Sequence, residues 1–501
     1  MSSSSPAVPT ALPLTTAGPG AGTSASPAAS PAASPAASPA ADPAEVLAAL
    51  GERLSDAATV VTDADVLATH ARDYAPICPA GTPLALVRAA STADVVAVLE
   101  VAFRYAVPVV PQGARTGLAG GANAVDGCLL LSVAGMDAIL DVDPVNMTAT
   151  VQPGVVNADL RRAAGEHDLF YPPDPASWQM STIGGNVATA AGGLCCVKYG
   201  VTADYVRALE VVLGDGRVLR TGRTTAKGVA GYDLTHLFVG SEGTLGVITE
   251  ITVSLRPRPQ APLTAVAFFP DVTAACRAVS DFMATGIGPS LLELMDRNSI
   301  DIVQADRDFG FPDDVSAMLI AQSDRGDLAP ADLQAFAAIA EEHGADVMVA
   351  DDEAEAAMLL EARRHLAVAM EKHGAFLSED VCVPRSRMVE LIEGVQEIQR
   401  THDVMLTCSG HAGDGNLHPT IFFDAQDADA VARAERAFDA VMELGLACGG
   451  TISGEHGIGV IKRGWLENEL GPVSIDVHHG IKALLDPAGL LNPGKVIAAR
   501  A

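Results

Sequence analysis

Basic residues are scarce in this sequence: 32 Lys and Arg stand against 62 Asp and Glu, a net charge of −30 over 501 residues. Such an acidic surface repels phosphate backbones and anionic membranes, so nucleic acid is an improbable partner. No uncharged apolar run reaches the roughly 18 residues that a membrane span requires. The length suffices for about two or three domains, each with its own core.

Paired cysteine motifs are also missing. The eight cysteines lack the short spacing of zinc knuckles and iron–sulfur sites and the density of a disulfide scaffold. We therefore expect reduced thiols and a cytoplasmic protein, either free or peripheral to a membrane. The adjacent Cys195 and Cys196 are expected to pack as small side chains rather than to react.

The first 41 residues contain no charged side chain, and residues 26–41 repeat Ser-Pro-Ala-Ala four times. Such a segment has too little apolar bulk to offset the entropy of ordering. It also lacks the basic start and continuous apolar stretch of a signal peptide. We expect residues 1–42 to form a disordered Ser/Pro/Ala tail.

The remaining chain divides into three parts. Residues 43–260 combine a helix at 44–54, a strand–helix–strand pattern from Pro83 to Gly113 and a hairpin around Gly214-Asp215-Gly216, which indicates a mixed α+β domain. Residues 261–469 follow a proline-rich linker and begin with the order β-α-β-β-α-β, typical of a ferredoxin-like antiparallel sheet. Its expected strands are 263–269, 290–295, 317–322 and 346–350, and its expected helices are 272–284 and 330–343. Residues 470–501 form a C-terminal segment.

Glycine gathers in three segments of the first domain. Pro111–Gly127 contains five glycines in seventeen residues, together with Arg115, so backbone N–H groups can converge on a phosphate. It matches neither a Rossmann fingerprint nor a Walker loop, and alone it could be a simple connector. Tyr171–Gly193 and His236–Pro257 add further glycine turns, which favours a long dinucleotide lying across several loops.

Histidines gather in two glycine-rich segments of the second domain. In SGHAGDGNLHP, His411 and His418 flank a tight reversal, so both imidazoles can face one cavity if the ends form a hairpin. In GGTISGEHGIGVIKR, Glu455 and His456 are adjacent. Two imidazoles and a carboxylate suit a catalytic divalent metal, although hydrogen-bonded loop residues would give the same pattern.

With these motifs in this order, the chain from Ala44 onwards resembles the FAD-linked oxidases and dehydrogenases of the vanillyl-alcohol oxidase type, in the branch of the glycolate oxidase catalytic subunit and D-lactate dehydrogenase. The resemblance implies a two-part FAD-binding domain, a cap domain with an antiparallel sheet, and a C-terminal segment that returns to the FAD-binding domain. The first glycine loop has no histidine, so the FAD should be non-covalent. The implied FAD contacts are Pro111, Gly113, Arg115, Thr116, Gly117, Pro173, Ser181, Gly184, Gly185, Asn186, Glu242, Gly246, Ile248 and Asn492.

The resemblance also assigns roles in the second domain. It implies His411, His418 and Glu455 as ligands of a divalent metal (zinc, manganese or iron) and His456 as the general base. Asn416 is a further catalytic candidate. An arginine suits a bidentate grip on a substrate carboxylate; the match favours Arg363, although that stretch also fits a solvated helix face.

These assignments predict FAD-dependent oxidation of a small D-2-hydroxy acid, of the D-lactate or glycolate class, to the 2-keto acid. Relatives acting on D-2-hydroxyglutarate carry a lysine where this chain has Ser378, which favours a monocarboxylate. The electron acceptor could be a quinone, a cytochrome, a partner flavoprotein or oxygen, and a homodimer is compatible with the sequence. The alternatives are an oxygen-using oxidase and an FAD-binding subunit without its own substrate in an electron-transfer complex.

Overall fold

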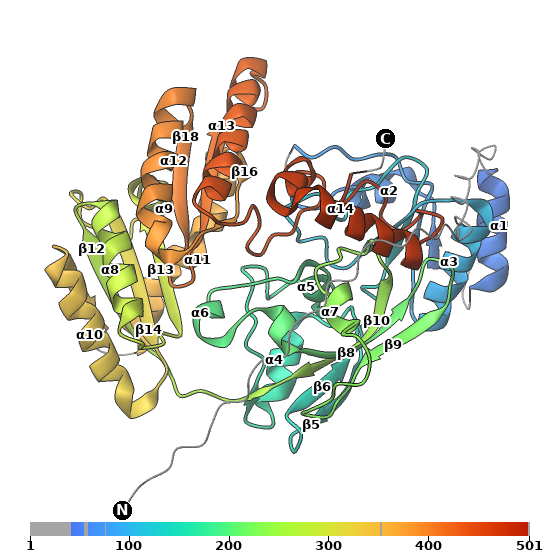
Figure 1. The fold of residues 1–501 in the computed structure, drawn as a ribbon, viewed down its shortest axis with the longest axis horizontal. Helices are drawn as coiled ribbons and strands as arrows, with labels where there is room; N and C mark the ends of the chain where they lie inside the picture. Colours follow the sequence, from blue (N-terminus) through green and yellow to red (C-terminus); the bar gives the residue numbers. More distant parts are fainter. Residues whose placement is uncertain (1–41, 55–58, 76, 351–352, 499–501) are drawn as a thin grey trace, which may run out of the picture. The chain divides into compact units, whose positions relative to one another are not determined.

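The computed structural model describes residues 42–54, 59–75, 77–350 and 353–498 (Figure 1). The expected disordered tail lies outside the described residues except for Asp42. The Asp42 carboxylate accepts a hydrogen bond from the amide of Ala44 and caps the first helix, α1 (Pro43–Arg53), close to the helix predicted at 44–54.

The first sheet contains the predicted strand–helix–strand unit. Its strands β2 (Ala85–Arg88), β4 (Leu129–Ser132) and β3 (Val109–Gln112) are parallel, and β1 (Val60–Val61) pairs with β2 in the antiparallel direction. Alternate side chains of these strands pack on α1 and α3 (Thr92–Tyr105), while the others pack with α2 (Ala64–His70). The parallel strands are therefore buried on both faces.

The second sheet is antiparallel and contains the predicted hairpin. It has the order β5-β6-β10-β8-β9, and β8 and β9 pair across the turn at Gly214-Asp215-Gly216. These strands are β5 (Ile139–Asp143), β6 (Thr148–Val151), β8 (Val206–Val212), β9 (Val218–Gly222) and β10 (Val247–Ser254). Around them lie α4 (Asn157–Gly165), β7 (Leu169–Phe170), α5 (Ile183–Thr189), α6 (Cys196–Tyr199), α7 (Thr235–Phe238) and β11 (Arg256–Pro257).

The third sheet begins with the expected ferredoxin-like strand order and then continues. The first four strands along the chain lie in the order β15-β12-β14-β13 and are all antiparallel, which confirms the predicted antiparallel sheet. They are β12 (Leu263–Phe269), β13 (Leu291–Asp296), β14 (Ala317–Ser323) and β15 (Asp346–Val349). Beyond β13 the sheet adds β18 (Met405–His411), β19 (Asn416–Phe423), β16 (Ala375–Ser378) and β17 (Val381–Cys382).

Helices cover both faces of this third sheet (Figure 1). Along β12, Ala265 and Ala267 belong to one apolar cluster and Val266 to the other, as strand alternation requires. The first cluster includes α8 (Val272–Ala284), α10 (Ala329–Glu342), α12 (Met388–His402) and α13 (Ala428–Ala447). The second includes α9 (Arg297–Asp306), which the sequence analysis did not predict, and α11 (Glu353–His373).

The last helix, α14 (Leu466–Leu485), bends at Gly471 and Pro472, where Gly471 has a φ of 76°. The boundary expected at residue 470 therefore falls inside this helix. After it, Leu491 forms a bridge to Val109 of β3. The C-terminal segment thus contacts the first sheet. Among the described residues, no helix is both long and apolar enough to cross a bilayer.

Candidate active site

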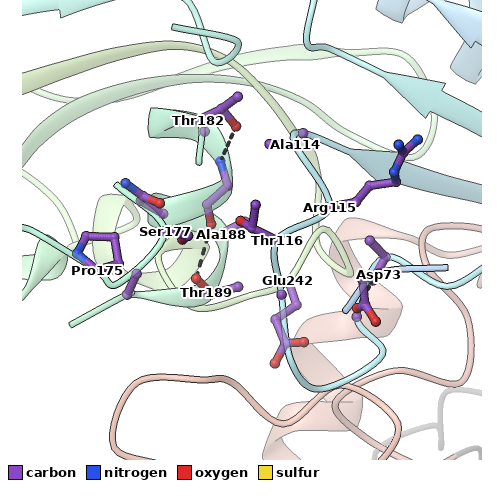
Figure 2. A pocket seen from close by; sticks show the side chains of 18 of the residues that line it. Asp73, Ala114, Arg115, Thr116, Pro175, Ser177, Thr182, Ala188, Thr189 and Glu242 are labelled. Carbon is purple, nitrogen blue, oxygen red and sulfur yellow. Dashed lines mark hydrogen bonds between the residues drawn. The ribbon is translucent and has the colours of Figure 1, made fainter. Parts of the chain in front are cut away.

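A cavity of about 360 Å³ is lined by the three glycine-rich segments. Figure 2 shows side chains around it from the first glycine loop (Arg115, Thr116), the loop before α5 (Pro175, Ser177) and the end of α5 (Thr189). Its volume lies within the range of small-molecule sites. The segments that the sequence singled out for a dinucleotide therefore surround one cavity.

Most of the predicted FAD contacts line this cavity, namely Pro111, Gly113, Arg115, Thr116, Gly117, Gly184, Gly185, Asn186, Glu242, Gly246 and Ile248. The structure also places there several residues that the sequence analysis missed, among them Asp73, Tyr74, Thr182, Ala188 and Thr189. Asp73 follows α2 and lies outside the three glycine-rich segments. Its carboxylate accepts a hydrogen bond from the amide of Ala122 in the first glycine loop.

Three predicted FAD contacts are not among the described lining residues. The carbonyl of Pro173 accepts a hydrogen bond from Asn157 Nδ2. Ser181 is buried, and its hydroxyl has no hydrogen-bond partner. Asn492 donates to the carbonyls of Gly121 and Glu242, so it holds two parts of the cavity wall together.

The cavity wall fits a ligand rich in hydrogen-bond acceptors. Asn186 lines the cavity, and its buried Nδ2 donor lacks a partner in the protein. The hydroxyl of Thr182 accepts from the amide of Gly185 at the start of α5 (Figure 2). A Cβ atom at Gly113 would lie only 2.5 Å from that hydroxyl oxygen, so the close approach of loop and helix requires glycine there. These residues fit FAD.

The two histidines of the predicted hairpin face each other. β18 and β19 pair around a tight turn, with His411 opposite Asn416 and Ser409 opposite His418. The imidazole centroids are 5.1 Å apart. The Nε2 atoms of His411 and His418 lie 3.1 Å and 3.2 Å from Oε1 of Glu455. The structure therefore brings the three predicted metal ligands together.

The outer nitrogens of both imidazoles have partners as well. Nδ1 of His411 lies 2.7 Å from the carboxylate of Glu293, and Nδ1 of His418 lies 3.3 Å from the carbonyl of Glu379. Histidines that bind metals usually hold the second nitrogen in this way, which leaves Nε2 as the metal donor. The donor set thus fits a divalent ion.

Electrostatics support the same arrangement. Burial lowers the pKa of the His411 imidazole, but the carboxylates of Glu293 and Glu455 outweigh it and raise that pKa well above its usual range. Burial raises the pKa of Glu455, yet His411 and His418 outweigh it and keep that pKa well below its usual value. The Glu293 and Glu455 carboxylates therefore stabilise a positive charge at this point, which a bound cation would supply.

His456 lies beside the histidine pair and lines the cavity. Its ring stacks on His418 with centroids 4.9 Å apart, and its buried Nδ1 lacks a partner. Burial lowers the pKa of His456 to about 4, so its imidazole is neutral near pH 7. Asp380, His418, Glu455 and His456 also place one possible ligand atom each within 4.8 Å of one another.

Arg363 on α11 contacts the same buried carboxylate as His411, that of Glu293. Its Nε donates to Glu293 at 2.9 Å, and Glu293 in turn contacts His411, whereas the neighbouring Arg364 is exposed. Arg363 is not among the described lining residues, but Ala367 and Glu371, further along the same helix, are.

Three other predicted positions lie outside the cavity. Asn416 packs against Gly454, and the hydroxyl of Ser378 lies 3.1 Å from that of Thr420. The thiol of Cys195 donates to the carboxylate of Asp174, and burial raises its pKa. All eight cysteines are free.

Two family models match the chain. "FAD binding domain" matches residues 83–222, and "FAD linked oxidases, C-terminal domain" matches residues 258–496. The glycolate oxidase subunit GlcD of Bacillus subtilis is 42% identical over 83% of this chain and 89% of its own length. The D-lactate dehydrogenase of Anaerostipes hadrus is 36% identical over 83% of this chain and 89% of its own length.

Solved structures share the fold at lower identity. 4-Ethylphenol oxidase from Gulosibacter chungangensis has a TM-score of 0.73 at 18% identity, over 91% of this chain and 97% of that one. p-Cresol methylhydroxylase has the same TM-score at 16% identity, with the same coverage. These likenesses support the predicted architecture of the vanillyl-alcohol oxidase type. The chain belongs to the FAD-linked oxidases and is an FAD-binding oxidoreductase.

Proposed function

We propose that this protein oxidises a small D-2-hydroxy acid, of the D-lactate or glycolate class, to the corresponding 2-keto acid. The observation that carries the proposal is the meeting of two histidine Nε2 atoms with Glu455 Oε1, while Glu455 and His456 line the FAD cavity. The relatives named glycolate oxidase subunit and D-lactate dehydrogenase support this substrate class.

His411, His418 and Glu455 would hold a divalent metal, with zinc, manganese and iron all compatible with these ligands. When bound, the ion would polarise the substrate hydroxyl and make it more acidic. The bound FAD would accept a hydride from the substrate carbon at its N5 atom. We propose non-covalent FAD, because the first glycine loop lacks a histidine.

His456 would accept the proton of the substrate hydroxyl. The imidazole is neutral near pH 7 and lines the cavity, so it can take up a proton there. Its stacking on His418 holds it next to the metal ligands.

Arg363 would bind the substrate carboxylate. Among the described contacts only its Nε is engaged, on Glu293, so the two Nη groups remain for a carboxylate. The bond to Glu293 orients the guanidinium and also links it to His411. Glu293 would thus fix both Arg363, which binds the substrate carboxylate, and His411, which holds the metal next to the substrate hydroxyl.

A second candidate function is that of an FAD-binding subunit that receives electrons within a larger complex. It is favoured by the word subunit in the name of the GlcD relatives. A subunit without its own substrate would not need the His411, His418, Glu455 and His456 cluster, which favours the catalytic proposal. An oxygen-using oxidase with the same residues differs only in the electron acceptor.

Anaerobic flavin bleaching tests the proposal. The purified yellow protein is mixed separately with D-lactate, L-lactate, glycolate and D-2-hydroxyglutarate, and absorbance at about 450 nm is followed with and without prior chelation. Rapid bleaching by D-lactate or glycolate, abolished by chelation, is the expected result. Absence of bleaching by every 2-hydroxy acid in metal-replete protein would overturn the proposal and favour the subunit without a substrate.

A further inference from the structure

Glu455 and His456 lie in a loop, Ser453–Gly457, that belongs to no helix or strand. A loop of this kind is placed only by the hydrogen bonds that its backbone and side chains make. The two functional side chains must nevertheless stay fixed relative to His411 and His418, which stand on paired strands. The residues that anchor the 453–457 loop therefore matter for the geometry of the site.

Asp380 supplies most of these anchors. Its Oδ2 atom accepts the backbone amides of Glu455 and His456, at 2.8 Å and 2.7 Å, and the hydroxyl of Ser453 at 2.9 Å. Its carbonyl accepts the amide of Gly454 at 3.0 Å. One residue thus binds four consecutive members of the loop.

Asp380 is itself fixed by the third sheet. It directly precedes β17, which pairs with β19, the strand that carries His418. Its second oxygen, Oδ1, has no hydrogen-bond partner and lies 3.7 Å from Nδ1 of His418. The same carboxylate therefore faces a predicted metal ligand on one side and the 453–457 loop on the other.

The ammonium group of Lys462 is buried next to this carboxylate. Nζ of Lys462 lies 3.5 Å from Oδ2 of Asp380, and the two side chains are 3% and 0% exposed. Buried charges persist in proteins when they are paired and hydrogen-bonded. Lys462 follows the loop by only five residues, so the pair connects its C-terminal end to the same carboxylate.

We propose that Asp380, with Lys462 as its counter-charge, is the positioning residue that holds Glu455 and His456 in register with the two histidines. The roles of Glu455 and His456 rest on the proposed function, whereas the anchoring of the loop does not. Carboxylates that orient metal ligands typically contribute 10- to 100-fold to metal affinity.

Hydrogen–deuterium exchange of the full-length FAD-loaded protein tests the anchoring. The variants are Asp380→Ala, which removes the two side-chain oxygens but keeps the backbone carbonyl, and Asp380→Asn, which keeps one side-chain oxygen. Asp296→Ala is the matched control, because Asp296 is also a buried carboxylate of the third sheet and accepts the amides of Ser299 and Cys408. We expect peptides covering the 453–457 loop to exchange at least 10-fold faster in Asp380→Ala, less so in Asp380→Asn, and unchanged in the control.

Zn²⁺ affinity, measured by competition with a fluorescent chelator, gives the second readout. We expect a loss of about 10- to 100-fold in Asp380→Ala, a smaller loss in Asp380→Asn, and less than a threefold change in Asp296→Ala. Unchanged exchange and affinity in both Asp380 variants would overturn the proposal, as would equal losses in the Asp296 control. If the unaltered protein bound no Zn²⁺, the assignment of His411, His418 and Glu455 as zinc ligands would be wrong. Hydrogen–deuterium exchange of the 453–457 loop would still decide whether Asp380 anchors it.

Discussion

Replacement of Arg363 by lysine tests the proposed binding of the substrate carboxylate without removing the positive charge at this position. Lysine keeps the positive charge but offers a single ammonium instead of a fork. In the structure Arg363 already uses Nε on the fully buried Glu293. A lysine that satisfied Glu293 could no longer make the paired bonds to a substrate carboxylate.

The expected size of the effect follows from those bonds. A hydrogen bond to a charged group contributes about 1.5–3 kcal/mol. Losing the bidentate grip but keeping the charge should cost about 2–3 kcal/mol, or roughly 30- to 150-fold in kcat/KM. The adjacent Arg364 is exposed on the same helix and gives the matched control Arg364→Lys, for which we expect less than a twofold change.

The assay is steady-state oxidation of D-lactate or glycolate with an artificial electron acceptor, combined with measurement of FAD content and Tm. The Arg363→Lys protein should keep its FAD, because Arg363 is not among the described cavity-lining residues. Equal kcat/KM for Arg363→Lys and the unaltered protein would refute the assignment of the carboxylate grip to Arg363. A large loss in Arg364→Lys would show that the wrong arginine had been chosen.

Three further changes probe other parts of the site. Glu242→Ala leaves the amides of Ile458 and Gly459 without their acceptor, so Tm measured by scanning fluorimetry should fall, at a cost of about 2–5 kcal/mol; an unchanged Tm would contradict this. Gly192→Ala places a Cβ atom 2.5 Å from Oε2 of Glu455 and should lower metal content, measured by elemental analysis. His418→Ala should lower metal content at least 10-fold and slow flavin reduction; normal metal content would remove His418 from the ligand set.

Local sequence patterns were sufficient to predict the parts of the site that lie within one segment. The His411 and His418 hairpin follows from a glycine turn between two apolar runs, because such a turn joins adjacent strands directly. The three glycine-rich segments line one cavity, as expected from the need for close backbone approach to a dinucleotide.

Contacts between site residues that are far apart in the sequence could not be predicted from the sequence. Glu293 is 118 residues from His411 along the chain, and it meets that imidazole only because β13 pairs with β18. The ferredoxin-like pattern predicted the first four strands, but a sheet edge can accept further strands, and the sequence does not indicate which segments extend it. The position of Asp380 depends on the same extension of the sheet, because Asp380 directly precedes β17, which pairs with β19.

The most direct test of the central claim is anaerobic stopped-flow reduction of the flavin by D-lactate carrying deuterium at carbon 2. If the site transfers that hydrogen from the substrate carbon to the FAD, the flavin should bleach more slowly with the deuterated substrate than with ordinary D-lactate, and L-lactate should bleach it slowly or not at all. Equal rates for the two D-lactates, in a reaction shown to be limited by flavin reduction, would contradict the proposed chemistry.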